Sequence, residues 1–250
     1  MTLPPDLSDK TVVITGASRG IGAGVARDLA ARGLRLGLCA RGAPALEDGP
    51  RALRAQVDVR DGEALERFAR DVEARLGPID LWVNNAAVLE PVGPLRDLES
   101  QAVRAHLEVN VLGVLHGARA YVGHLARVAR PGVLVNVSSG AARRAVAGWA
   151  AYCASKAAVE RLTEVLALEE GPRGLRAHAV SPGVVDTDMQ RAIRATDEAR
   201  FPDVERFRAM AREGRLSSVE HVARCLLALA FDPEDPARGE VVVAFPPERA

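Results

Sequence analysis

Tyr152 and Lys156 stand four residues apart in a chain that contains only two tyrosines. Of its 33 basic residues, only Lys10 and Lys156 are lysines, and the rest are arginines. Residues four apart share one face of a helix, so a phenol and an ammonium are expected side by side. A neighbouring cation favours the phenolate and lowers a tyrosine pKa from about 10, which predicts a usable proton donor. The alternative interpretation of this pair alone is a surface tyrosine above a solvated lysine.

Two further polar side chains are spaced to assist such a donor. Ser139 follows the apolar run Val133–Ser138, and its hydroxyl there can orient and polarise a carbonyl oxygen. Asn110 lies inside a long helical pattern, where its side chain competes for backbone hydrogen bonds. We expect Asn110 to hold a water that relays protons toward Lys156. An inward-facing polar residue is the alternative.

Glycines surround the turn between the first predicted strand, Thr11–Thr15, and the predicted helix Ile21–Arg32. They permit a tight turn and a close approach of the backbone to a diphosphate, and the helix presents unpaired N–H groups to an anion. This strand–turn–helix context is the one that a dinucleotide-binding motif requires, with a merely glycine-rich turn as the alternative. The residues expected to bind the cofactor here are Gly16, Ser18, Arg19, Gly20, Ile21 and Gly22.

The end of the second predicted strand, Leu34–Ala40, indicates which dinucleotide binds. An NAD site usually carries an acid there for the ribose 2′-hydroxyl, whereas Arg41 follows this strand. An arginine binds a 2′-phosphate bidentately, and Arg19 can approach the same place from the glycine turn. The sequence therefore predicts NADP, with two ordinary surface arginines as the alternative.

Later strands end in further candidate cofactor contacts. The third predicted strand is Ala55–Val59, and its last residues, Asp58 and Val59, are placed to meet the adenine edge. Asn85 follows the fourth predicted strand, where its amide can hold the cofactor ribose or tie adjacent strands together.

Apolar strand-like runs alternate with amphipathic helical stretches along the whole chain. Strands without polar alternation, separated by helices, predict a parallel sheet covered on both faces, and right-handed crossovers make it a doubly wound, Rossmann-type α/β fold. Without repeats or long linkers, residues 1–250 are expected to form a single domain. The remaining predicted strands are Ile79–Asn84, Val133–Ser138, Leu175–Ser181 and Glu240–Ala244. The remaining predicted helical segments are Asp61–Leu76, Leu98–Arg130 (interrupted by its glycines), Trp149–Glu170, Thr187–Arg212 and Ser218–Ala230.

Composition argues against several other classes of protein. The net charge of +0 gives no reason to expect nucleic acid or an anionic membrane as a partner, and no apolar run reaches the ~18 residues of a membrane span. The polar N-terminus lacks a signal-peptide core. The three cysteines, Cys39, Cys153 and Cys225, lack metal-ligand spacing, so we expect reduced thiols, no metal and a cytoplasmic location.

Together these motifs resemble the short-chain dehydrogenase/reductase superfamily, in its branch of short chains, over nearly the whole sequence from about Lys10 to Phe245. The glycine turn of that family matches Thr15–Gly22. Its Asn-Asn-Ala-Gly element matches residues 84–87, with Ala87 where glycine is usual. The resemblance is specific because these elements occur together and in order.

The same resemblance assigns individual residues. The family's serine precedes its tyrosine by thirteen positions, which selects Ser139 over Ser138, and its mid-helix asparagine is Asn110. Its proline–glycine element implies cofactor contacts after the sixth strand, at Pro182, Gly183, Val185 and Thr187.

The resemblance also implies a carbonyl reductase. NADPH would deliver hydride to a carbonyl carbon while Tyr152 protonates the oxygen that Ser139 holds. Lys156 would bind the nicotinamide ribose, so Tyr152 and Lys156 count as cofactor contacts as well. In that family the helices that correspond to Leu98–Arg130 and to the Tyr152 helix commonly pair across a two-fold axis, so the resemblance implies a homodimer or homotetramer.

Residues 184–216 are expected to form a substrate-binding excursion. Its residues Asp186–Gln190, the charged helix after them and Glu213–Leu216 resemble the sepiapterin reductase and benzil reductase subgroup, which implies a ketone or vicinal dicarbonyl. Pterin-reducing members carry an acid in the final strand where this chain has Val243, which favours an apolar dicarbonyl. Trp149, Val184 and Met189 are expected to line the pocket with Ser139 and Tyr152, and ordinary core contacts are the alternative.

Two other functions remain open. One is a secondary-alcohol dehydrogenase that uses NAD. The other is a non-enzymatic NADP-sensing protein, which would keep the glycine turn but would not need Ser139, Tyr152 and Lys156.

Overall fold

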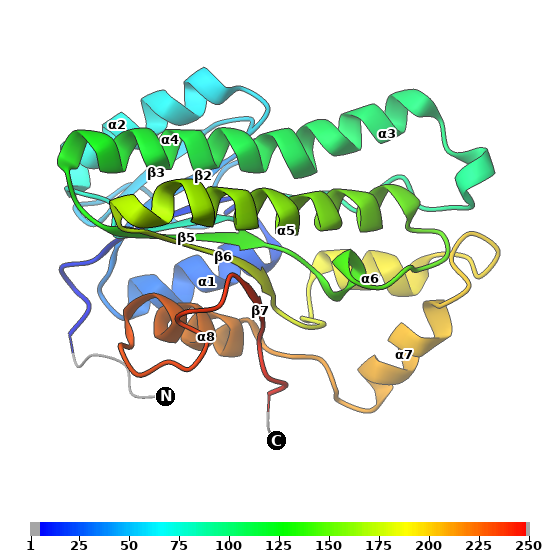
Figure 1. Ribbon diagram of the computed structural model, residues 1–250. Coiled ribbons are helices and arrows are strands. Elements are labelled where there is room, and N and C mark those ends of the chain that lie inside the picture. Colours follow the sequence, from blue (N-terminus) through cyan, green and yellow to red (C-terminus); the bar gives the residue numbers. More distant parts are fainter. Residues whose placement is uncertain (1–5, 249–250) are drawn as a thin grey trace.

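A central seven-stranded sheet lies between two layers of helices in the computed structural model, which describes residues 6–248 (Figure 1). The strand order is β3–β2–β1–β4–β5–β6–β7, and every neighbouring pair is parallel. β1 (Thr11–Thr15) is buried along its whole length, because it lies inside the sheet with helices on both faces. The predicted doubly wound, single-domain α/β fold is confirmed.

The other strands are β2 (Arg35–Ala40), β3 (Ala52–Gln56), β4 (Leu81–Asn84), β5 (Gly132–Val137), β6 (Leu175–Ser181) and β7 (Val242–Ala244). The prediction of β3 at Ala55–Val59 is wrong by three residues, since β3 pairs with β2 from Ala52 to Gln56. The apolar residues that prompted it, Val57 and Val59, are buried under helices beyond the end of this half-exposed edge strand.

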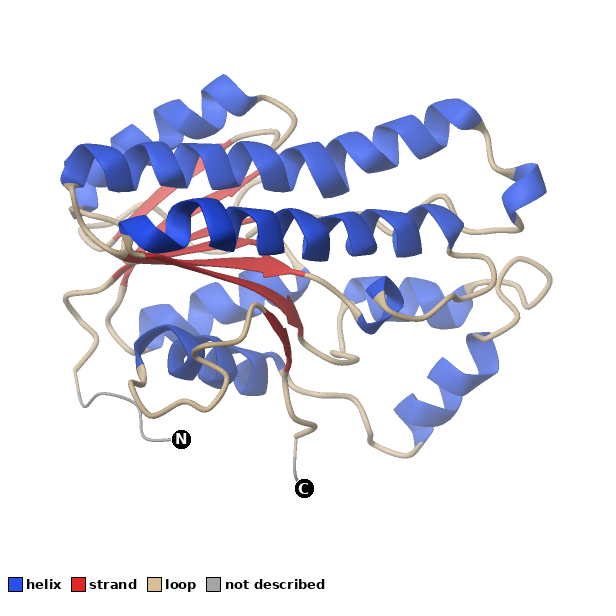
Figure 2. Cartoon of the chain, in the orientation of Figure 1, coloured by secondary structure: helices blue, strands red, loops and turns tan. Residues whose placement is uncertain are grey.

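The helices divide between the two faces of the sheet (Figure 2). α1 (Gly20–Ala31) and α8 (Val219–Phe231) pack on one face, and α2 (Gly62–Leu76), α4 (Gly113–Val128) and α5 (Ala150–Glu170) cover the other. α6 (Asp188–Ala195) and α7 (Val204–Arg212) lie beyond the carboxyl ends of the strands, so the predicted excursion resolves into two helices (Figure 1). No helix within residues 6–248 is long and apolar enough to cross a membrane.

The long predicted helix Leu98–Arg130 is interrupted, but not at its glycines. α3 (Ser100–Leu107) runs into a π-helical turn, Glu108–Leu112, and α4 follows without a break. Gly113 and Gly117 lie inside α4, where a Cβ atom would collide with Val59 and with Asn84 Oδ1 respectively. These glycines therefore allow the helix to approach the sheet closely and do not end it.

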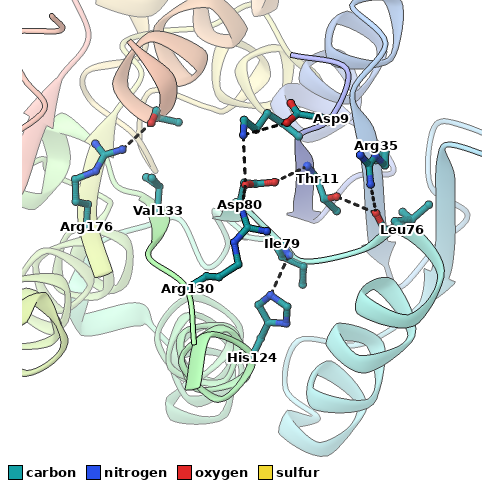
Figure 3. A network of polar contacts seen from close by, with 12 residues as sticks. Asp9, Thr11, Arg35, Leu76, Ile79, Asp80, His124, Arg130, Val133 and Arg176 are labelled. Atoms are coloured by element: carbon teal, nitrogen blue, oxygen red, sulfur yellow. Dashed lines mark hydrogen bonds and ion pairs between the residues drawn. The ribbon is translucent and has the colours of Figure 1, made fainter. Parts of the chain in front are cut away.

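A polar network joins the elements at the amino ends of the strands (Figure 3). Asp80 Oδ2 accepts a hydrogen bond of 3.0 Å from the Thr11 N–H, which joins the starts of β4 and β1. The buried Tyr121 hydroxyl donates to the Asp80 carbonyl at 3.0 Å and accepts from the Val133 N–H at 3.1 Å. Backbone groups at the strand entries are thus satisfied without water.

The buried side chain of His124 extends this network. Its Nε2 accepts from the Ile79 N–H at 2.9 Å, so the ring hydrogen is on Nδ1, which lies 2.9 Å from Glu73 Oε2. The ring links α4 to the loop before β4 and to α2. All three cysteines are free thiols, as expected.

Candidate active site

Tyr152 and Lys156 lie on the first two turns of α5, beside the carboxyl end of β5. Their exposed fractions are only 9% and 2%, and Lys156 Nζ is 5.6 Å from the centroid of the Tyr152 ring. The ammonium donates a 2.8 Å hydrogen bond to the Val137 carbonyl, the last residue of β5. This arrangement rules out the interpretation of a surface tyrosine above a solvated lysine.

The two side chains titrate differently from the prediction. Burial raises the pKa of Tyr152 to about 12, although a hydrogen bond with Ser139 acts to lower it. Burial also lowers the pKa of Lys156 to about 8. The prediction that Lys156 pulls the Tyr152 pKa downward is wrong for the protein as described, because loss of water disfavours the charge on both groups. Tyr152 therefore keeps its proton at neutral pH, as a donor requires.

The two adjacent serines point to different partners. Ser139 Oγ accepts from the Ala141 N–H at 3.2 Å, begins a short 3₁₀ turn and hydrogen-bonds with the Tyr152 hydroxyl. Ser138 is buried and donates to Glu160 Oε1 at 3.1 Å. Only Ser139 is therefore placed to touch a group bound at the phenol.

Asn110 lies in the π-helical turn, fully buried, and its amide is held by protein groups. Its Oδ1 accepts from the Val88 N–H at 2.8 Å, and its Nδ2 lies 2.9 Å from the Val88 carbonyl and 3.0 Å from His106 Nε2. Both amide hydrogens face protein acceptors, which favours the interpretation of an inward-facing polar residue. The water relay toward Lys156 stays a prediction.

The glycine turn folds tightly against the segment after β4. Gly16 and Gly20 have φ values of 68° and 58°, a region that L side chains rarely adopt. A Cβ atom on Gly22 would lie 2.5 Å from Asn85 Nδ2. That Asn85 amide donates to the Thr15 carbonyl at 2.9 Å, so it ties adjacent strands, one of its two predicted uses.

The N-terminus of α1 is open to an anion. Arg19 is its N-cap but makes no side-chain cap, and the first turn holds no acidic residue. Only the Thr187 side chain, at 3.8 Å, would lie within 4 Å of a Cβ atom on Gly20. Free N–H groups beside this open backbone fit a diphosphate. Ser18, half-buried in the same turn, borders this space.

Other predicted cofactor residues gather nearby. Thr187 caps α6 by accepting from the Gln190 N–H at 3.4 Å, and Val185 bridges to Ser217. Gly183 has a φ of 81° in the turn between β6 and this bridge. One small apolar cavity is lined in part by Ile21, Gly22, Asn85 and Pro182, which come from three separate segments of the chain.

An ion pair between Asp58 and Arg60 lies where the adenine of the cofactor is predicted to bind. Asp58 receives a 2.7 Å hydrogen bond from Arg60, which lowers the pKa of that carboxyl, with a smaller contribution from Arg41. The Val59 carbonyl lies 3.0 Å from His116 Nδ1. Arg41 itself is exposed after β2.

An aromatic cluster covers the other side of Tyr152. Trp149 meets the Tyr152 ring edge-on at 5.5 Å and stacks on Phe201 at 4.7 Å, and Phe207 packs beside both. Val184 and Met189, two predicted substrate contacts, pack against the same cluster. Phe201 and Phe207 are not among the residues predicted from the sequence. Both lie within the predicted helical segment Thr187–Arg212, whose pattern gave no indication that they pack on Trp149.

Comparison with known proteins places this geometry in a family. A family model described as short chain dehydrogenase matches residues 10–198. L-xylulose reductase from Homo sapiens is 35% identical over 233 residues, covering 90% of this chain and 91% of that protein. Benzil reductase ((S)-benzoin forming) from Bacillus cereus is 30% identical over 244 residues, covering 92% and 97%. The crystal structure of a short chain dehydrogenase from Burkholderia cenocepacia J2315 in complex with NADP has a TM-score of 0.76 and 28% identity, covering 96% of this chain and 90% of that one.

A parallel sheet with a glycine turn after its first strand and a buried phenol at its carboxyl edge defines a nucleotide-dependent oxidoreductase. More particularly, the chain belongs to the short-chain dehydrogenase family. Enzymes of this family use nicotinamide cofactors. Among the residues that the structure describes, no group of His, Cys, Asp or Glu could hold a metal ion.

Proposed function

We propose that the protein is an NADPH-dependent carbonyl reductase that converts a small ketone or vicinal dicarbonyl to a hydroxy compound. The observation that carries the proposal is the convergence of Tyr152, Ser139 and Lys156 at the carboxyl end of β5. Ligands of open α/β sheets bind beyond this edge, and the glycine turn opens at the same edge.

When bound, the nicotinamide cofactor supplies the hydride. Tyr152 holds the proton that the carbonyl oxygen needs, and Ser139, hydrogen-bonded to the phenol, orients that oxygen. As the phenol loses its proton, negative charge develops beside the ammonium of Lys156, which the Val137 carbonyl holds in place. The lysine therefore stabilises the charge that appears during reaction, even though the resting phenol is not acidic.

The choice of NADP is supported by two arginines. The Ala17 N–H donates to the Cys39 carbonyl at 3.1 Å, which draws the glycine turn to the end of β2. Arg19 and Arg41 each follow one of these residues by two positions, and both are exposed. A 2′-phosphate there would meet two guanidinium groups.

The substrate class is supported by the apolar surroundings of the phenol. Trp149 and the phenylalanines of the excursion exclude water from Tyr152, which suits an apolar carbonyl compound. The similarity to a benzil reductase supports the same class. A pterin or sugar would need polar partners in a region that is mainly apolar.

Self-association is supported by apolar side chains left exposed on two neighbouring helical segments. Leu112 and Leu115 are 43% and 37% exposed, and Val165 and Leu168 on α5 are 42% and 79% exposed. Such residues are typical of an interface, so we propose a homodimer or homotetramer. Light scattering should give a mass above 26.5 kDa, the mass of one chain, and a monomer would contradict this.

The direct test is NADPH oxidation with a panel of ketones and vicinal dicarbonyls, benzil included, followed by absorbance. Wild-type protein should turn over at least one dicarbonyl faster with NADPH than with NADH. Arg41→Asp should weaken NADPH use by about 10-fold or more, because a carboxylate repels a 2′-phosphate. Arg27→Asp is the matched control, since Arg27 is exposed farther along α1.

The outcomes separate the alternatives. A wild-type preference for NADH would overturn the cofactor assignment. NADPH binding without turnover of any carbonyl or alcohol would favour the sensing protein.

A further inference from the structure

His106 is the most deeply buried titratable group beside the site to which no role has yet been assigned. It lies one turn before Asn110 on α3, with an exposed fraction of 1%. Its Nδ1 is 2.7 Å from the Glu90 carbonyl. A carbonyl oxygen only accepts, so the Nδ1 atom carries a hydrogen and donates it.

The second ring nitrogen then faces one N–H donor and one hydroxyl oxygen. His106 Nε2 lies 3.0 Å from Asn110 Nδ2 and 3.0 Å from Ser155 Oγ. In the neutral ring this nitrogen accepts the Asn110 Nδ2 hydrogen that is not donated to the Val88 carbonyl. The Val88 backbone fixes the orientation of the Asn110 amide, and the neutral His106 ring supplies the acceptor for the remaining amide hydrogen.

The same ring supports the phenol. The rings of His106 and Tyr152 meet edge-on, with centroids 6.2 Å apart at 75°. Trp149 makes a similar edge contact, at 5.5 Å and 71°. Ser155, which His106 contacts, also donates 2.8 Å to the Tyr152 carbonyl in the first turn of α5. His106 therefore contacts both the phenol ring and the helical turn that carries it.

The hydrogen bond from Asn110 to His106 requires a neutral ring. A second ring hydrogen on Nε2 would point at the N–H of Asn110, donor against donor. Burial lowers the pKa of His106, a hydrogen bond to Glu90 opposes the shift, and the charge of Lys156 lowers the pKa further. The exposed Glu90 carboxylate is occupied by the Val92 N–H.

We propose that His106, neutral and protonated on Nδ1, is a positioning residue that holds the Tyr152 phenol in its reactive orientation and satisfies the remaining amide hydrogen of Asn110. The inference rests on the proposed carbonyl reduction, because the orientation matters only if Tyr152 donates a proton. It assigns His106 no direct contact with substrate.

Two variants test the role through kinetics. His106→Phe keeps a ring against Tyr152 but removes donor and acceptor, and kcat should fall by about 10-fold to 100-fold, since small misplacements of reacting groups are costly. KM and the Kd for NADPH should change less than about 2-fold, because the cofactor cradle is untouched. His106→Gln can donate to Glu90 and accept from Asn110, so it should recover most of kcat.

His124→Phe is the matched control, because it removes a second buried histidine that is protonated on Nδ1 and does not contact Tyr152. Wild-type kcat in His106→Phe would overturn the proposal. So would an equal loss in the Phe and Gln variants, or a loss of kcat in His124→Phe of the same size.

A spectroscopic measurement separates this inference from the proposed function. Long-range ¹H–¹⁵N correlation of the imidazoles at pH 7 should show His106 neutral with its hydrogen on Nδ1. A charged ring, or a hydrogen on Nε2, would overturn the positioning role whether or not the enzyme is active. Absence of any turnover in the wild type with this tautomer intact would instead count against the proposed reaction.

Discussion

Two buried histidines, one at each edge of the sheet, make nearly the same hydrogen bonds and have different expected roles. His124 at the amino edge and His106 at the carboxyl edge both carry the ring hydrogen on Nδ1 and accept through Nε2. His124 accepts from the backbone N–H of Ile79 and faces Glu73, so its neighbours are fixed by the fold. His106 accepts from Asn110, beside Tyr152.

The comparison indicates that the position of a buried polar network decides its role. A network at the amino edge of the sheet supports stability, and one at the carboxyl edge supports turnover, even when the side chains are alike. At the amino edge the network completes the hydrogen bonding of strand entries (Figure 3). At the carboxyl edge the backbone ladders end and side chains face the ligand. Variants at the amino edge should therefore change stability, and variants at the carboxyl edge should change turnover.

The largest effect is expected for Tyr152→Phe. Loss of the proton donor should reduce kcat about 10³-fold, within the range that general acid catalysis contributes. The melting temperature and the Kd for NADPH should stay near wild type, because burial of the ring is kept. Turnover near the wild-type value would contradict the role of Tyr152 as proton donor. It would also contradict the proposed difference between the two edges of the sheet.

Among the effects on stability, the largest is expected for His124→Phe, which should leave turnover nearly unchanged. It leaves the Ile79 N–H and the Glu73 carboxylate without their ring partner, which should cost about 2–3 kcal/mol in the free energy of unfolding. Urea denaturation measures this loss, while kcat should change less than about 2-fold. If kcat falls under conditions where all of the protein is folded, the networks at the two edges of the sheet are coupled.

Lys156→Met should stabilise the protein while abolishing most turnover. The folded-state pKa of Lys156 is about 8, below its ordinary value of 10.5, so the unfolded chain binds more protons between these pH values. The buried charge therefore destabilises the fold below pH 8, and this penalty disappears as pH rises toward 10.5. We expect a gain of about 2 kcal/mol at pH 7 that is lost by pH 10.5. Urea denaturation across this range checks the sign, and a gain that grows with pH contradicts it.

Asp80→Asn should give the smallest effect. Lys10 and Arg130 lie 3.8 Å from the Asp80 carboxylate and lose only weak ion pairs, whereas an amide oxygen can still accept from Thr11. The unfolding free energy should fall by about 1 kcal/mol, and less at high salt. If the loss of unfolding free energy does not depend on salt, it arises from packing and not from the lost ion pairs.

Much of the fold could be predicted because local patterns and tertiary environment agree. The buried strands β1 and β6 consist of apolar or small residues apart from Arg176 and His178, and the structure places both strands where predicted. The grouping of Ser139, Tyr152 and Lys156 followed from spacing along one strand end and one helix. Each of these signals lies within a short stretch of the chain, so a single sequence is enough to recognise it.

What could not be predicted depends on partners distant in the chain. β3 was misplaced because Val57 and Val59 are buried by helices and not by strand pairing. The pKa of Tyr152 was predicted in the wrong direction, since spacing shows the neighbouring cation but not the loss of water. His106 was overlooked, although its position one turn before Asn110 was the available signal.

The π-helical turn at Glu108–Leu112 has a consequence for anyone who redesigns this chain. Because the extra residue shifts the helical phase, α3 and α4 present their buried faces to different neighbours, α5 and α2. A residue pattern extrapolated from α3 at 3.6 residues per turn would assign the wrong face beyond Leu112. Deleting one residue from the turn would restore a regular helix and swing Asn110 out of register, so insertions and deletions here should be tolerated far less than those in the exposed loops.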